Sequence, residues 1–205
     1  MGDGEEQKKH KYGGAGRALC AFLLIFLILG AITLLILWLI YRPTKPKFTL
    51  VSLAIYQLNL TPPPFLSATI QFTLLTRNSH PRLSYHYNHL SAFVSYKNEA
   101  ITPAVSLPPL SHGAKSTVAI SPVLDRGPVP VSVSVLNGLV MDEAYGMVAL
   151  RLVFKGKLRY KGGAIKSRRY SVYVECDLLV GFNREFGAAQ LSLLPSSSPQ
   201  CNTHM

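Results

Sequence analysis

The longest uninterrupted apolar stretch, residues 18–40, constrains this chain more than any other feature. Its 23 residues carry no charge, and as a helix they would extend about 34 Å. That length is enough to cross a hydrocarbon core of about 30 Å with a slight tilt. Trp38 and Tyr41 lie at its far end, where aromatic rings prefer the headgroup level. We therefore expect a single transmembrane helix over residues 18–40.

Two other interpretations of this stretch are less favourable. A cleaved secretory signal would have a shorter apolar core and a cleavage site of small residues. Here Gly30 and Ala31 are followed by nine more apolar or neutral residues, 32–40, so a cut there would leave a hydrophobic stub. A buried helix of a soluble protein would show a strong amphipathic pattern, which this stretch lacks. An uncleaved signal-anchor remains the favoured interpretation.

The basic residues that flank the stretch orient it only slightly. Four of them precede it and three follow it, namely Lys8, Lys9, Lys11 and Arg17, then Arg42, Lys45 and Lys47. This difference places the N-terminus in the cytosol by the positive-inside rule. The 164 residues after Tyr41 point the same way, because long domains translocate largely regardless of charge. We expect a cytosolic head and an extracellular body.

The chain divides into five parts on this basis. They are a short head (1–17), the transmembrane helix (18–40), a proline-bearing linker (41–47), a β-rich domain (48–194) and a polar tail (195–205). Within the domain, short runs rich in Val, Ile, Thr, Phe and Tyr alternate with turn residues. Residues 68–76, 90–96 and 170–180 alternate apolar and polar side chains, as half-buried strands do. Residues 116–124 predict a further strand, weakened by Pro122. About seven strands predict one antiparallel β-sandwich, immunoglobulin- or fibronectin-III-like.

The segment 129–141 fits two structures. Val131, Val133 and Val135 alternate as in a strand, whereas Val131, Val135 and Leu139 recur at helical spacing. We favour a short helix.

The cysteines and the single glycosylation sequon are consistent with an extracellular body. Cys176 and Cys201 both lie in the body, so they can form a disulfide or remain free thiols. Asn59 begins the only Asn-x-Ser/Thr sequon and is followed closely by Pro62. Cys20, at the cytosolic mouth of the transmembrane helix, is either a candidate acylation site or a plain buried thiol.

No convergent catalytic or metal-binding set is recognisable in the sequence. His80, His86 and His89 are close in sequence, but on an extended strand they would not converge, so we interpret them as solvated loop histidines. The acid pairs Asp142-Glu143 and Glu175/Asp177 lack a base or a nucleophile to complete a site. We therefore predict no catalytic residue, no metal, no cofactor and no enzymatic activity.

One surface of the body is predicted to be strongly basic. The body contains 17 Lys and Arg against seven acids. Eight of these bases fall between residues 151 and 169 with no acid among them: Arg151, Lys155, Lys157, Arg159, Lys161, Lys166, Arg168 and Arg169. Alternation along 151–161 would place the bases on one strand face and Leu152, Phe154, Leu158 and Tyr160 on the other. Such a face either keeps the domain soluble or binds a polyanion.

Several motifs resemble those of a plant membrane protein family. Residues 77–88, Arg-Asn-Ser-His-Pro-Arg-Leu-Ser-Tyr-His-Tyr-Asn, resemble the Asn-Pro-Asn and Tyr-Tyr-Asp signature of the harpin-induced-like and non-race-specific-disease-resistance-like proteins. Leu107-Pro108-Pro109 with Gly113 resembles their Pro-Pro-Phe-Tyr-Gln-Gly segment, with Leu110-Ser111-His112 at the aromatic positions. Residues 154–157, 166–170 and 174–177 are similar to a basic strand pair, and 198–201 to a terminal cysteine motif.

This resemblance carries expectations beyond the residues themselves. It implies a late-embryogenesis-abundant group-two domain, which is a seven-stranded sandwich with one helix, and it assigns that helix to segment 129–141. It also implies plasma-membrane residence and a part in defence or stress responses. We expect a non-catalytic binding, adhesion or signalling module whose basic face binds an anionic wall polysaccharide, an anionic lipid or an acidic protein. Nucleic acid is not expected outside the cell. The alternative is a membrane-tethered domain that binds or transfers lipid between its sheets. The sequence leaves the oligomeric state open.

Overall fold

The computed structural model describes residues 6–60, 64–125, 127–163, 165–183, 190–193 and 201–205. The chain forms two compact units, Met1–Arg42 and Pro43–Met205. The second unit is called the body.

The first unit is a single helix, α1 (Glu6–Tyr41). Its part Gly16–Tyr41 is long and apolar enough to cross a membrane. Large apolar side chains along it are exposed, including Phe22 at 68% and Phe26 at 69%, so this surface is suited to an apolar solvent. Thr33 donates its hydroxyl hydrogen to the carbonyl oxygens of Leu29 (3.0 Å) and Gly30 (2.8 Å), which satisfies its polar group within the helix. The helix also extends into the segment predicted as a head.

The body is built on five long strands, which are β1 (Lys47–Leu60), β2 (Phe65–Arg77), β3 (Ser84–Tyr96), β10 (Met147–Gly162) and β11 (Ile165–Asn183). The other described strands have two to four residues: β4 (Glu99–Ala100), β5 (Val105–Leu107), β6 (Leu110–His112), β7 (Thr117–Ile120), β8 (Val123–Leu124), β9 (Val129–Pro130), β12 (Gln190–Leu193) and β13 (Asn202–His204). The strand predicted over 116–124 is thus divided into β7 and β8, with Pro122 in the gap between them.

The strands form two antiparallel layers. Their hydrogen-bonded order is β4-β3-β10-β11-β12-β1-β2-β7, so β12 connects the layer of β3, β10 and β11 to the layer of β1 and β2. The rings of Phe72 on β2 and Phe154 on β10 meet edge to face across the interior, with centroids 5.3 Å apart. The predicted antiparallel sandwich is confirmed.

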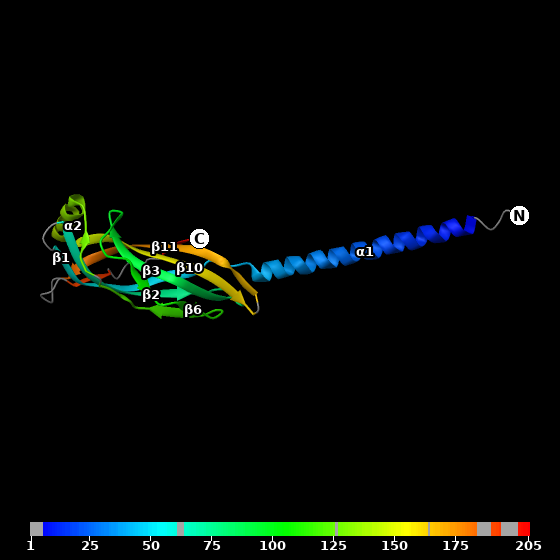
Figure 1. Cartoon of the computed structure of the whole chain (residues 1–205), viewed down its shortest axis with the longest axis horizontal. Helices are drawn as coiled ribbons and strands as arrows, with labels where there is room; N and C mark the ends of the chain where they lie inside the picture. The colour runs from blue at the N-terminus through cyan, green and yellow to red at the C-terminus, as the bar shows by residue number, and fades with distance from the viewer. Residues whose placement is uncertain (1–5, 61–63, 126, 164, 184–189, 194–200) are drawn as a thin grey trace. The chain divides into compact units, whose positions relative to one another are not determined.

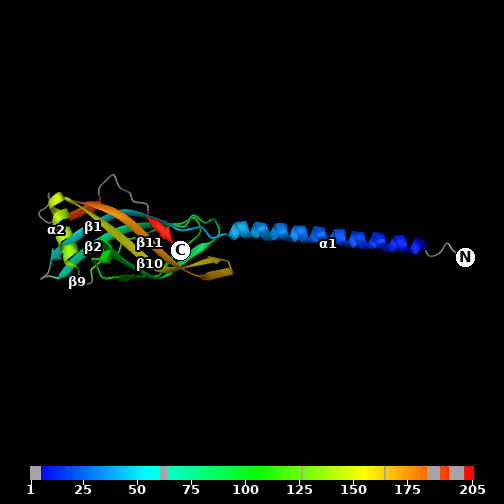
Figure 2. The ribbon, with the colours of Figure 1, turned by 90° about the horizontal axis from the view of Figure 1, so that it is seen from above.

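One further helix, α2 (Val133–Tyr145), confirms the helical interpretation of segment 129–141. Ser132 caps its N-terminus by accepting a hydrogen bond from the amide of Val135 (3.4 Å). Gly146 ends it in the left-handed conformation, φ 79°. Figures 1 and 2 both show α2 at one end of the body and the turn between β10 and β11 at the other.

The core follows the alternation seen in the sequence. Every second residue of β2 from Leu66 to Leu74 is buried, and so are the apolar residues of the other long strands at alternate positions. On β11 these are Val172, Val174, Cys176, Leu178 and Val180. The polar residues between them face outward and form the outer surface of β10 and β11.

Candidate functional site

The outward face of β10 and β11 carries the predicted cations. Lys155, Lys157 and Lys161 on β10 are exposed, and Arg151 and Arg159 are half-buried. The register places Arg169 of β11 opposite Arg159, and Lys166 opposite Lys161. Arg168 is exposed beside a register shift in this hairpin. The eight cations named from the sequence, residues 151–169, are called the basic face.

The cations near the β10–β11 turn have no ionic partner in the described part of the chain. Like charges lie opposite each other at Arg159/Arg169 and Lys161/Lys166, an unfavourable arrangement unless an anion is near. On the other side of β10, His86 of β3 lies opposite Arg159. The Arg159 Nε atom is buried and has no hydrogen-bond acceptor among the described residues. This end of the face is suited to receive an anionic group.

Aromatic rings surround the cation at the middle of the basic face. The Lys155 ammonium lies 5.1 Å from the ring centroid of Phe93 and 5.4 Å from that of Tyr173, within the range of cation–π attraction. Neither ring was predicted to belong to the basic face. A signal was present for Phe93, which occupies a polar position in the alternating segment 90–96. Lys155 is therefore better fixed than a free surface lysine.

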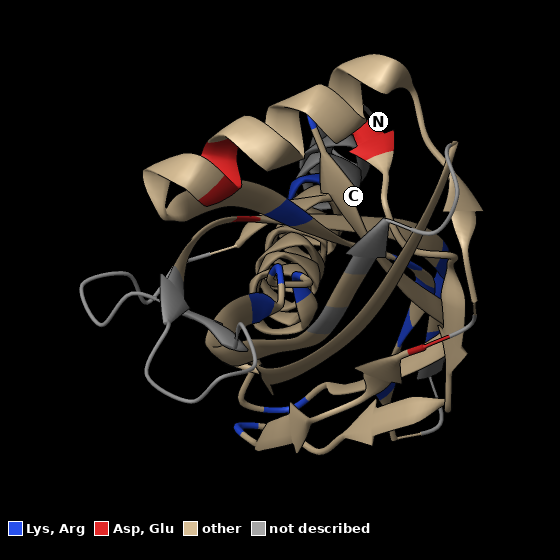
Figure 3. Cartoon of the chain, turned by 90° about the vertical axis from the view of Figure 1, so that its left-hand side faces the viewer, with Lys and Arg blue, Asp and Glu red and all other residues tan. Residues whose placement is uncertain are grey.

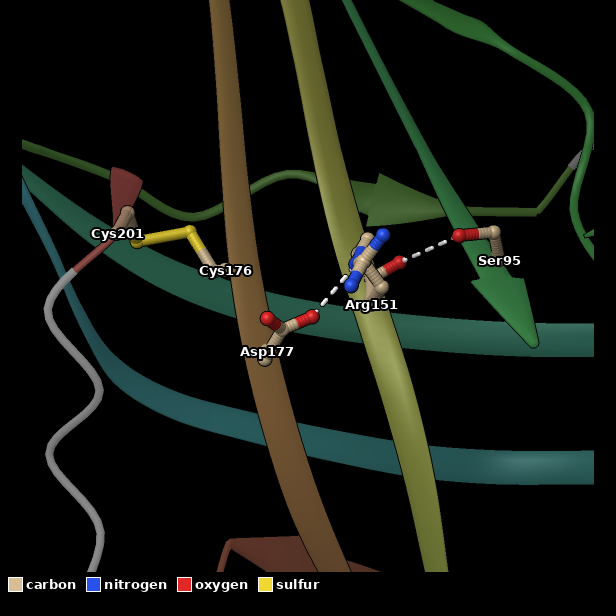
Figure 4. A network of polar contacts seen from close by, with 5 residues as sticks. All are labelled: Ser95, Arg151, Cys176, Asp177 and Cys201. Carbon is tan, nitrogen blue, oxygen red and sulfur yellow. Dashed lines mark hydrogen bonds and ion pairs between the residues drawn. A yellow bond between two sulfur atoms is a disulfide. The ribbon is translucent and has the colours of Figure 1, made fainter. Parts of the chain in front are cut away.

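At the other end of the basic face, an acid neutralises Arg151. Its Nε donates to Asp177 Oδ1 at 2.6 Å, the one ion pair found within the described residues. Figure 4 shows the two side chains together on neighbouring strands, with Ser95 donating to the Arg151 carbonyl oxygen. The Asp177 carboxylate raises the pKa of Arg151 above its ordinary value through this hydrogen bond and its charge. Arg151 is thus partnered, unlike the cations near the turn.

An apolar cavity of about 260 Å³ opens at the outer edges of the two layers. Its wall consists of Leu90, Leu107, Pro108, Leu110, Ile120, Ser121 and Pro122. It lies between β6, which pairs with β3, and β7, which pairs with β2. Leu110 is one of the residues that replace aromatic positions of the family pattern.

Cys176 and Cys201 form a disulfide, which settles the alternatives left open by the sequence. Figure 4 shows it linking β11 to the segment that leads into β13. Cys20 is a free and exposed cysteine. Asn59 belongs to β1 opposite Ser67, whereas its sequon partner Thr61 lies outside the described residues. Most of the tail, 194–200, also lies outside them.

The interpretation of all three histidines as solvated loop residues is wrong for His80, which is buried, and for His86 and His89, which lie on strand β3, with His86 half-buried. The His80 side chain is only 2% exposed, and its Nδ1 accepts hydrogen bonds from the backbone amides of Arg82 (3.1 Å) and Leu83 (2.9 Å). The Asn78 amide fastens the same loop by donating to the carbonyl oxygen of Leu83 (2.7 Å). His80 therefore holds a turn together. His89 is exposed, with φ 52°.

The two acid pairs lie apart from any nucleophile–base arrangement in the described residues. Asp142 on α2 accepts a hydrogen bond from the Tyr96 hydroxyl at 2.7 Å. Burial, with the Asp142 hydrogen bond and charge, raises the pKa of Tyr96 to about 12. Among the described residues, no group of three His, Cys, Asp or Glu side chains is placed to hold a metal ion.

The fold and this surface define a class of protein with one apolar N-terminal helix and a disulfide-bonded, basic β-sandwich. Comparison with known proteins identifies the family to which the chain belongs. NDR1/HIN1-like protein 12 of Arabidopsis thaliana is 30% identical over 162 residues, which cover 79% of this chain and 77% of that protein. NDR1/HIN1-like protein 1 of the same plant is 30% identical over 158 residues, or 75% of each chain. NDR1/HIN1-like protein 26 is 28% identical over 170 residues, 82% of this chain and 79% of that one. The chain belongs to the NDR1/HIN1-like protein family.

Two other comparisons add nothing to this assignment. No family model matches the chain. A crystal structure of a protein from Archaeoglobus fulgidus aligns with 62% of this chain and 94% of its own at 14% identity, but the TM-score of 0.31 is too low to support a conclusion.

Proposed function

We propose that this chain is a single-pass, membrane-anchored, non-catalytic protein of plant defence or stress responses. In this proposal α1 anchors the chain in the plasma membrane with its head in the cytosol. The body, a domain of the late-embryogenesis-abundant group-two type, is a binding module outside the cell. Membership of the NDR1/HIN1-like family and the length and apolarity of Gly16–Tyr41 support this assignment.

The observation that carries the binding role is the set of unpartnered cations near the β10–β11 turn. Lys157, Lys161 and Lys166 are exposed, and no carboxylate of the described residues lies within ion-pair distance of them. Like charges that lie opposite each other on two strands destabilise a sheet unless an opposite charge neutralises them. An anionic partner supplies that opposite charge, and the candidates are an acidic wall polysaccharide, an anionic lipid or an acidic protein.

Binding of the detergent-solubilised full chain to polygalacturonate tests the binding role. We expect binding that weakens as salt rises from about 50 mM to about 500 mM, because salt screens exposed charges. Lys157→Gln/Lys161→Gln should weaken it severalfold. Lys8→Gln/Lys9→Gln removes the same charge from the head and should leave it unchanged. Binding that is absent, or that ignores salt and both variants, would contradict the role.

The apolar cavity supports a second candidate, a domain that holds a lipid tail. Its wall is almost wholly apolar, with Ser121 as the exception, and small-molecule pockets are lined predominantly by such side chains. Native mass spectrometry of the full chain should then show a bound lipid that Leu110→Trp displaces by filling the cavity. A chain that takes up no lipid would remove this candidate.

A further inference from the structure

The linker enters the body at the same end as the β10–β11 turn. The hydroxyl of Tyr85 donates to the Thr44 carbonyl oxygen at 2.7 Å and lies 2.8 Å from the Thr44 hydroxyl. Tyr85 in turn lies opposite Tyr160, two residues before the end of β10, and their rings meet edge to face at 5.0 Å. We call this end of the body the entry end.

Cations from separate parts of the sequence lie at the entry end. Lys47, at the start of β1, lies opposite Arg77, at the end of β2. Arg82 is exposed and lies in the following turn, which leads into β3. Lys161 and Lys166 flank the β10–β11 turn. No acid of the described body lies on these segments, so their charges sum without internal compensation.

The described acids of the body lie towards the opposite end. Glu99 accepts hydrogen bonds from the amide (2.7 Å) and the hydroxyl (2.6 Å) of Ser132, which caps α2. Asp142 and Glu143 belong to α2 itself, and Figure 3 shows an acidic segment on this helix. Glu175 and Asp177 lie in the half of β11 that is farther from the β10–β11 turn. Most described acids thus lie towards the α2 end, where Lys97 also lies and Asp177 is paired with Arg151, whereas the described segments of the entry end carry cations without acids.

Covalent geometry limits how far the entry end can lie from the end of α1. Thr44 follows Tyr41 by three residues, and three residues span at most about 11 Å. A helix that crosses a membrane and ends near Tyr41 therefore holds the entry end within reach of the lipid headgroups. Tethering at this distance gives the headgroups a high effective concentration around the basic surface.

We propose that the entry end docks on the anionic phospholipid headgroups of the membrane that holds α1, with the α2 end of the body directed away from it. This inference rests on the anchoring role proposed above and names the partner of the same cations. Because the body is proposed to lie outside the cell, the relevant headgroups are those of the outer leaflet, and Lys and Arg side chains are attracted to its anionic headgroups within a Debye length. The acids at the α2 end are repelled by the same surface, so attraction and repulsion favour the same orientation.

The test measures the depth of two labelled positions in nanodiscs that contain the full chain. In a Cys20→Ser background, a fluorophore is attached at Ser79→Cys, in the exposed turn of the entry end, or at Asn137→Cys, on the exposed side of α2. Quenching by a nitroxide on the lipid headgroups reports proximity to the bilayer. Nanodiscs with about 30% anionic lipid are compared with zwitterionic ones, at about 50 mM and about 500 mM salt.

We expect anionic lipid to increase quenching at the entry-end label alone, and high salt to reverse the increase. Lys161→Gln/Lys166→Gln should remove at least about half of this increase. Lys97→Glu, which lowers the charge by the same two units away from the entry end and outside the basic face, should leave most of it. Quenching that is equal in both lipids, or equal at both labels, would overturn the inference. If polygalacturonate binding persists in that case, the proposed function stands and its partner is not the membrane. A chain that sodium carbonate extracts from membranes would instead refute the anchor.

Discussion

At the scale of single residues, buried polar groups without partners distinguish one part of the core. Both ring nitrogens of His112 are buried without a hydrogen-bond partner in the described residues, and the buried hydroxyls of Tyr87 and Thr76 lie close to each other. The rings of His112 and Tyr87 meet edge to face at 5.6 Å. Burial lowers the pKa of His112 below its ordinary 6.5 and raises that of Tyr87. Both side chains are therefore held neutral, and a charged imidazole is disfavoured.

This burial makes stability depend on pH. In the unfolded chain His112 gains a proton as pH falls through about 6.5, whereas in the folded chain it does so only at lower pH. Its contribution is therefore fully present above about pH 6.5 and is lost as pH falls from there towards the folded pKa. We expect the melting temperature to fall between about pH 7 and about pH 5, and to fall less in His112→Phe, which keeps a ring beside Tyr87. Equal decreases in both proteins, measured by circular dichroism, would contradict this.

At the scale of elements, the close packing of α2 against Tyr96 and Lys97 depends on the absence of a side chain at Gly138. A Cβ at Gly138 would come within 2.7 Å of the Tyr96 hydroxyl and 2.5 Å of the Lys97 ammonium. Lys97 is flexible, but Tyr96 is buried and donates to Asp142. Gly138→Ala should therefore lower the free energy of unfolding by about 1 kcal/mol, because crowding outweighs the gain in helix propensity. Asn137→Ala, on the exposed side, should change it by less than about 0.5 kcal/mol. A stabilising Gly138→Ala in urea unfolding would show that the helix shifts freely.

The disulfide fastens the end of the chain to β11. The two cysteines are separated by 25 positions, for which loop-closure entropy predicts about 3 kcal/mol. Cys176→Ala/Cys201→Ala should lower the free energy of unfolding by about that amount, measured from the near-ultraviolet circular dichroism of the body. Cys20→Ser should leave it unchanged, since Cys20 is exposed and unpaired. A double variant as stable as the parent would mean that the strands alone hold this segment.

The elements also show what the sequence can and cannot predict. Alternation correctly predicted the buried faces of β2, β3 and β11, because each of these strands has one face in the core. It placed the lysines of β10 on one face but did not predict that Asp177 would pair with Arg151. That contact depends on the register between two strands, which single-strand periodicity does not contain. His80 was missed for a similar reason, since turn residues indicate a loop but not where its side chains point.

At the scale of the whole molecule, the proposed binding role depends on the distribution of charge. The chain carries a formal net charge of +11, but the structure concentrates cations at the entry end and acids near α2. We expect the full chain in detergent to bind a polyanion with its affinity governed by the cations near the β10–β11 turn. Net charge alone would make every lysine equivalent, so unequal effects of charge-matched variants separate the two explanations.

Protease protection in intact plant protoplasts tests the central claim most directly. The chain carries one epitope tag before residue 1 and another after residue 205, and protease is added outside the cells. If α1 is an uncleaved anchor with the body outside, the C-terminal tag is digested, and the N-terminal tag survives on a membrane-bound fragment. Protection of the C-terminal tag, or a mature chain that has lost the N-terminal tag together with α1, would contradict the account.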